Sequence, residues 1–145
     1  MFSMMQSMPY AGAKISGNSM YPNIDGEVSF YEVYGGTFVV AIVKGLPNGN
    51  GFHGFHIHDG SSCVPGRAGS HYNPTNQAHP QHAGDLPPLL ANNGMAFSAF
   101  YTNRFYPEDI VGEVVIIHAM ADDFKTQPSG NPGDIVACGV IKEKE

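Results

Sequence analysis

The chain has 145 residues, which is close to the usual length of one domain, and we expect a single domain over residues 1–145. Seven basic and thirteen acidic residues give a net charge of −6, which excludes the strongly basic surface of a nucleic-acid-binding protein. The hydrophobic content of 42% excludes disorder, and no stretch approaches the ~20 apolar residues of a membrane-spanning helix. We therefore expect a globular protein with no nucleic-acid and no membrane partner.

The first ten residues contain no basic residue and no continuous apolar stretch, so they lack the features of a secretory signal. Residues 1–9 are expected to form a flexible N-terminus. On this ground alone a cytoplasmic location is the default expectation, and the compartment stays open.

Short strands separated by tight turns are the elements that the composition favours. Val and Ile together outnumber Leu five to one, and Gly with Pro makes up a fifth of the chain. In chain order, the expected strands cover residues 13–17, 27–33, 37–46, 51–58, 95–102, 112–119 and 135–141. No stretch has a sustained helical period of apolar residues, so we predict an all-β sandwich or barrel.

Two long segments, 59–90 and 121–134, interrupt this pattern and are rich in Gly, Pro, Ser and Asn. Long loops on a rigid scaffold usually carry function. Five of the seven histidines lie between Gly54 and Asp85, just before or within the first of these segments. The chemistry of the protein is therefore expected there.

His56 and His58 lie two residues apart in an expected strand, so both imidazoles are expected on one face of the sheet. Two nitrogens on one face could bind one metal ion. Read alone, the pair is equally compatible with exposed or hydrogen-bonded histidines. The odd offset of His53 turns it to the opposite face, where we expect a structural hydrogen bond.

The loop that follows supplies His71, His79, His82 and Asp85, a set of nitrogen and carboxylate ligands that suits zinc. His79, His82 and Asp85 are spaced three residues apart, close enough in a turn to reach one tetrahedral ion. His71 is then the expected fourth ligand. His118 ends the apolar run 114–117 and would reach the same site from a core strand, although alone it could be a hydrogen-bonded core histidine.

The two cysteines, Cys63 and Cys138, are too few and too far apart for a thiolate zinc cluster. A disulfide, a free pair and chance all remain open from their spacing alone.

The string resembles the copper/zinc superoxide dismutase family over essentially the whole chain after Tyr10. No single motif is specific, but the matching pieces occur in the family's order. They are Gly54-Phe55-His56-Ile57-His58, Gly69-Ser70-His71-Tyr72-Asn73-Pro74, His82-Ala83-Gly84-Asp85-Leu86, Ile117-His118-Ala119-Met120-Ala121-Asp122-Asp123 and Ala137-Cys138-Gly139-Val140. The resemblance implies a Greek-key β-sandwich or flattened eight-stranded barrel with two long functional loops.

The resemblance also implies the metal ligands. Copper would bind to His56, His58, His71 and His118, and zinc to His71, His79, His82 and Asp85, so that His71 bridges both ions. This division agrees with the ligand preferences of Cu(II) and Zn(II). Asp122 matches the carboxylate that joins copper and zinc ligands through hydrogen bonds.

The implied reaction is the disproportionation of superoxide to oxygen and hydrogen peroxide by Cu(II)/Cu(I) cycling, with His71 and His118 as the catalytic residues and zinc as a structural ion. Cys63 and Cys138 match the family's disulfide, which would pin the loop before the zinc site to the last strand. A disulfide fits an oxidising compartment. The family includes monomers and dimers, so a homodimer is one alternative.

Two departures from the family pattern bear on activity. Ile135 stands where family members normally carry an arginine that attracts superoxide, and the zinc loop between His79 and His82 is short. Lys125, Arg67 or Arg104 could supply the missing charge, or each could be a surface charge with no role. The alternative function is a weakly active or non-catalytic copper/zinc-binding protein, for metal storage or as a structural component.

Overall fold

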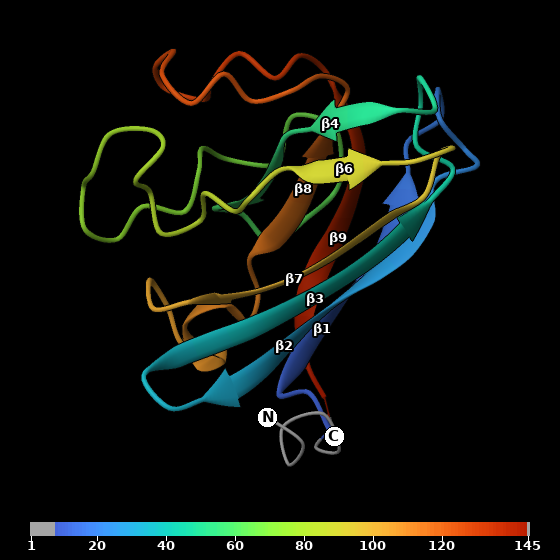
Figure 1. Ribbon diagram of the computed structural model, residues 1–145. Coiled ribbons are helices and arrows are strands. Elements are labelled where there is room, and N and C mark those ends of the chain that lie inside the picture. Colours follow the sequence, from blue (N-terminus) through green and yellow to red (C-terminus); the bar gives the residue numbers. More distant parts are fainter. Residues whose placement is uncertain (1–7, 145) are drawn as a thin grey trace.

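Nine strands and one short 3-10 helix lie within residues 8–144, the part of the chain that the computed structural model describes (Figure 1). Most of the expected flexible N-terminus, residues 1–7, lies outside the described residues. The elements are β1 Ala11–Gly17, β2 Asp25–Val33, β3 Gly36–Lys44, β4 Gly51–His53, β5 Phe55–His58, β6 Leu89–Ala91, β7 Ala96–Thr102, η1 Pro107–Ile110, β8 Val114–His118 and β9 Ile135–Glu143. No helix among them is long and apolar enough to cross a bilayer.

Seven strands form one antiparallel sheet in the order β5-β8-β9-β1-β2-β3-β7, and β4 pairs with β6 in a second, two-stranded sheet. The long sheet curls, and β4 and β6 lie side by side above β7 and β3 in the view of Figure 1. Neighbours such as β5 and β8 are distant in the sequence, as Greek-key connections require. The predicted all-β Greek-key barrel is confirmed.

The expected strand 51–58 is wrong in one respect, because it divides at Gly54 into β4 and β5. β4 pairs with β6, whereas β5 pairs with β8, so the chain passes from one sheet to the other at this glycine. A Cβ atom at Gly54 would lie 2.8 Å from Cβ of Pro132, which leaves no room for a side chain. β6 and η1 were not expected, since β6 occupies only three residues at the end of the segment expected to be loop.

Both faces of β5 and β8 are buried, whereas most of the other strands alternate between buried and exposed residues. One face of these two strands packs into the hydrophobic core through Phe55, Ile57, Val115 and Ile117. The loops 59–88 and 119–134 cover the opposite face, where the histidines lie (Figure 1). A polar site is thereby enclosed beside a well-packed core.

The predicted disulfide between Cys63 and Cys138 is confirmed, with a Cα–Cα distance of 5.8 Å. It joins loop 59–88 to β9 across a sequence separation of 75 residues. The loop that carries His71, His79, His82 and Asp85 is therefore covalently tied to the main sheet.

Candidate metal centre

His56, His58 and His118 meet on the loop-covered face of β5 and β8. The antiparallel register of the two strands and an irregularity between Ile117 and His118 bring the third ring alongside the first two. Each of the three side chains offers a ring nitrogen within 4.8 Å of the others. All three histidines are buried.

The second nitrogen of each ring is held by a hydrogen-bond acceptor. His56 Nε2 lies 2.7 Å from Asp122 Oδ2, His58 Nδ1 donates to the Gly69 carbonyl at 2.8 Å, and His118 Nδ1 donates to the Gly133 carbonyl at 3.1 Å. Because a carbonyl oxygen can only accept, the proton of His58 and His118 is fixed on Nδ1.

The remaining nitrogens are buried and have no hydrogen-bond partner in the part of the chain that the structure describes; they are His56 Nδ1, His58 Nε2 and His118 Nε2. A buried acceptor without a partner is costly, so lone pairs left this way fit a metal ion. Three imidazole nitrogens on one side of the sheet suit copper.

His71 lies between this cluster and the carboxylate loop. Its ring stacks on His56 with a centroid distance of 4.0 Å, and its Nε2 is buried without a hydrogen-bond partner among the described residues. Its Nδ1 faces the other way, 2.7 Å from Asp85 Oδ1 and 3.2 Å from His82 Nδ1. The two nitrogens of one ring therefore face two separate groups of ligand atoms.

The second group forms around Asp85. His56, His71, His79 and Asp85 each offer a ligand atom within 4.8 Å of the others. His82 joins them, since its Nδ1 lies 3.1 Å from Asp85 Oδ2, as does His79 Nδ1. Three imidazole nitrogens and one carboxylate are a donor set that zinc prefers, and His56 is committed to the first cluster through its free Nδ1.

Asp122 connects the two groups. Its Oδ2 lies 2.7 Å from His56 Nε2 and its Oδ1 lies 2.7 Å from His79 Nε2. Burial alone would raise the pKa of Asp122, but the hydrogen bonds from His79 and His56 outweigh it and hold the pKa below its ordinary value. The carboxylate therefore stays ionised and orients both rings.

The pKa values of the buried histidines favour the neutral, metal-binding form. Burial, reinforced by the charge of His71, lowers the pKa of His56 from 6.5 to about 3, and burial lowers that of His58 to about 4. The pKa of His118 is also lowered, again chiefly by burial. These rings therefore offer lone pairs rather than protons near neutral pH.

A pH dependence of the metal-free protein follows. Because His56 and His58 bind a proton more weakly when folded, the unfolded chain takes up more protons below about pH 6.5, and stability falls as the pH drops from there toward 4. Each histidine contributes a slope of about 1.4 kcal/mol per pH unit. Urea unfolding of chelator-treated protein at about pH 7.5 and pH 5 measures this loss. An unchanged free energy of unfolding would contradict it.

A cavity of about 450 Å³ opens onto His58 and His71. Its other lining residues are Asp59, Gly69, Ser70, Asn73, His82, Pro128 and Ser129. No lysine or arginine lies among these described lining residues. Ile135 lines a different cavity, of about 530 Å³, beside the disulfide.

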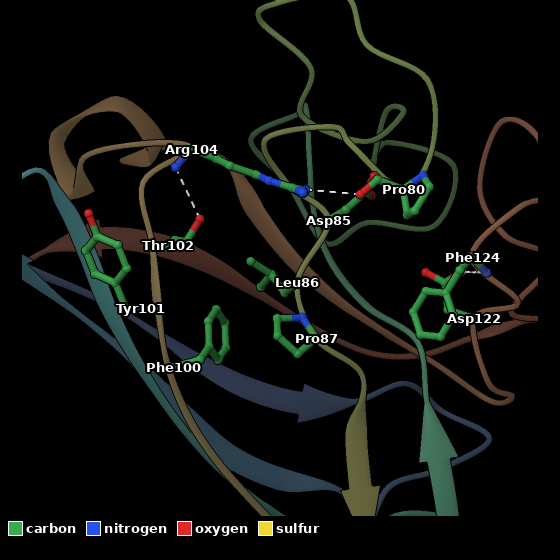
Figure 2. Close-up of a pocket in the computed structure, with 10 residues that line it drawn as sticks. All are labelled: Pro80, Asp85, Leu86, Pro87, Phe100, Tyr101, Thr102, Arg104, Asp122 and Phe124. Atoms are coloured by element: carbon green, nitrogen blue, oxygen red, sulfur yellow. Dashed lines mark hydrogen bonds between the residues drawn. The ribbon is translucent and has the colours of Figure 1, made fainter.

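Of the three cations considered from the sequence, Arg104 has a defined place. Its guanidinium donates to backbone carbonyls of the loop that carries His79 and His82 (Figure 2). This contact was not expected from the sequence, and neither were the hydrogen bonds of His58 and His118 to the Gly69 and Gly133 carbonyls. His53 is buried and hydrogen-bonds to the His118 carbonyl at 2.9 Å, as expected.

The copper/zinc superoxide dismutase family model matches residues 24–141. The chain is 34% identical to a superoxide dismutase [Cu-Zn] of Legionella pneumophila, with 98% of this chain and 93% of the relative covered. It is also 34% identical to one of Deinococcus radiodurans, covering 82% and 78%. The structure of Cu/Zn superoxide dismutase from Brucella abortus matches with a TM-score of 0.75 at 28% identity, covering 90% of this chain and 98% of that one. The chain belongs to the copper/zinc superoxide dismutase family, whose members use copper and zinc.

Proposed function

We propose that this chain is a superoxide dismutase that binds copper through His56, His58, His71 and His118 and zinc through His71, His79, His82 and Asp85. One observation carries the proposal: four buried imidazole nitrogens on the copper side lack a hydrogen-bond partner among residues 8–144. Every one belongs to a histidine whose other nitrogen is already engaged. The names of the relatives, which are superoxide dismutases, support the same activity.

Copper, when bound, would supply the one-electron oxidation of one superoxide and the one-electron reduction of the next. The chain's own residues hold the rings and manage protons. His71 lines the His58–His71 cavity, and we expect its Nε2 to take up and release a proton in each cycle while Nδ1 stays beside Asp85. His118 is the second catalytic residue, because its Nε2 is free and its Nδ1 is fixed by Gly133.

Metal analysis and superoxide consumption test this function together. Protein loaded with both metals is expected to contain one copper and one zinc per chain and to consume superoxide, whereas protein loaded with zinc alone is expected to be inactive. Copper without zinc in the purified protein would contradict the zinc assignment. Equal rates for the two preparations would contradict the enzyme.

The absence of lysine and arginine among the described residues that line the His58–His71 cavity favours a second candidate, a non-catalytic copper/zinc-binding protein for storage or structure. Such a protein would bind both metals and show no turnover in the same assay. Sedimentation of the loaded protein tests whether it forms a homodimer, which the sequence leaves as an alternative.

The side chain at position 135 and the net charge of the chain predict how the rate responds to salt. We expect dismutation to be slower and less salt-sensitive than in arginine-bearing relatives, because Ile135 supplies no charge and the chain carries a net charge of −6. The measurement is kcat/KM for superoxide between about 0.01 M and 0.15 M ionic strength. The Ile135→Arg variant, as a comparison, is expected to be faster and more sensitive to salt. A near-diffusion-limited rate in the unaltered protein that falls steeply with salt would refute this account.

A further inference from the structure

The turn formed by residues 79–82 is held from outside by two side chains that offer no ligand to a metal. These are Gln127, from the loop 119–134, and Arg104, from the segment between β7 and η1. The turn carries two of the four residues that we assign to zinc, His79 and His82. What holds its backbone therefore decides where those two imidazoles point.

Gln127 makes two hydrogen bonds to the backbone of His79. Its Oε1 accepts from the His79 backbone N–H at 2.9 Å, and its Nε2 donates to the His79 carbonyl at 2.7 Å. The short turn before Gln127 is itself fixed, since Asp123 Oδ1 accepts from the backbone N–H groups of Lys125 and Thr126. The turn at Asp123 therefore fixes the position of the Gln127 side-chain amide, which lies 48 residues from His79 in the sequence.

Arg104 holds the other end of the turn. Its Nη1 donates to the carbonyls of Pro80 and His82, both at 3.0 Å. The next residue is anchored in the core, because Phe105 is buried and its carbonyl accepts from Thr37 Oγ1 at 2.7 Å. Figure 2 shows the Arg104 side chain extending toward Pro80 and Asp85, which line the same cavity.

The position of Arg104 also argues against a role in attracting superoxide. It lines a cavity of about 330 Å³ with Asp85, Asp122 and Phe124, whereas the cavity that opens onto His58 and His71 is a separate one. Its bonds to Pro80 and His82 also direct the guanidinium to the backbone of the turn. The charge that Ile135 lacks is not supplied from here.

We propose that Arg104 and Gln127 are positioning residues that pre-form the turn 79–82, so that His79 and His82 meet zinc without rearrangement of the backbone. The inference rests on the proposed function only in taking zinc as the ion at these residues. His79 is then oriented at its backbone by Gln127 and at Nε2 by Asp122, and these contacts leave its Nδ1 beside Asp85. Residues that orient metal ligands in this way typically change metal affinity by about 10–100-fold.

The test is zinc affinity, measured by chelator competition on Gln127→Met, Arg104→Leu and the double variant. Each single variant is expected to bind zinc about tenfold more weakly and the double variant about 100-fold. Cobalt substituted for zinc is expected to give an altered visible absorption spectrum in the variants, because the ligand geometry changes. Copper affinity, measured in zinc-free protein, is expected to stay unchanged.

Two milder variants keep the test valid if an apolar substitution prevents folding. Gln127→Glu retains the acceptor for the His79 N–H but loses the donor to its carbonyl, and Arg104→Lys retains one charged donor. Both are expected to bind zinc with an affinity between those of the unaltered protein and the apolar variants.

Matched controls are Gln81→Met and Arg67→Leu, since neither side chain makes a hydrogen bond or ion pair within residues 8–144. Both controls are expected to bind zinc as the unaltered protein does. A purely structural role would lower the melting temperature of the metal-free variants and leave zinc affinity and the cobalt spectrum unchanged, and that result would overturn the inference. Failure of the unaltered protein to bind zinc would instead refute the zinc site of the proposed function.

Discussion

Replacing Gly130 by alanine is expected to disrupt the zinc side of the site. A Cβ atom at this position would lie 2.0 Å from Asp122 Oδ1 and 2.5 Å from His79 Nε2, directly on the hydrogen bond between them. Either the carboxylate or the ring must move, so the bond that orients His79 is lost. We expect zinc affinity to fall by about 100-fold.

Stability is expected to fall as well. Gly130 has a φ of +82°, where an alanine costs about 1 kcal/mol from backbone strain alone. Loss of the hydrogen bond between His79 and the ionised Asp122 adds about 1.5–3 kcal/mol, because the bond from His56 to Asp122 remains. Chelator competition and urea unfolding of the metal-free variant measure the two losses independently.

Gly66→Ala is the control for this substitution. Its φ of +81° is nearly the same, but a Cβ atom there would meet nothing within 4 Å. The control therefore reproduces the backbone strain without the collision and is expected to bind zinc normally. If both variants bound zinc equally well, the Asp122–His79 bond would not be needed to orient the ligand.

Removal of the disulfide by the double substitution Cys63→Ala and Cys138→Ala is expected to cost about 4 kcal/mol of unfolding free energy in the chain-entropy treatment. The closed segment of 75 residues is long, so the unfolded chain gains much conformational freedom when the link is absent. Urea unfolding of the metal-free variant, beside the unaltered protein with and without reductant, gives the value.

The same variant is expected to weaken copper binding. The segment that the disulfide ties down includes Gly69, whose carbonyl fixes the proton of His58 and whose N–H donates to the Asp59 carbonyl. When this segment moves, His58 loses the acceptor that sets its tautomer. A variant that lost stability but bound copper as before would limit the disulfide to a role in folding.

The candidate ligands could be picked out from the sequence because their grouping depends partly on local spacing. A repeat of two along β5 places His56 and His58 on one face, and the three-residue steps from His79 to Asp85 fit one turn. Turn residues placed the ends of the expected strands near the observed ends. The break at Gly54 was missed because it results from a change of partner strand, which neither propensity nor periodicity records.

The side chains that hold the turn 79–82 could not be predicted either, because they lie far from it in the sequence. Gln127 meets His79 from 48 residues away, and Arg104 meets Pro80 from 24 residues away. Both read as ordinary surface residues in the sequence, and Gly130 reads as one of several turn glycines. Only the packing of loop 119–134 and of the β7–η1 segment onto the turn gives them a function.

The loops that carry the candidate site also complete the sheet. β5 lies at the end of the seven-stranded sheet, and its outer edge hydrogen-bonds to loop 59–88. The Ile57 N–H donates to the Gly84 carbonyl, and the Ile57 carbonyl accepts from the Tyr72 N–H. The Leu86 N–H donates to the Phe55 carbonyl. An uncovered edge strand of this kind invites pairing with another molecule. Loss of the metals or reduction of the disulfide, if it frees loop 59–88, would therefore expose the edge of β5 to pairing with another molecule. Bound metals and an intact disulfide would thus also protect the protein from edge-to-edge aggregation.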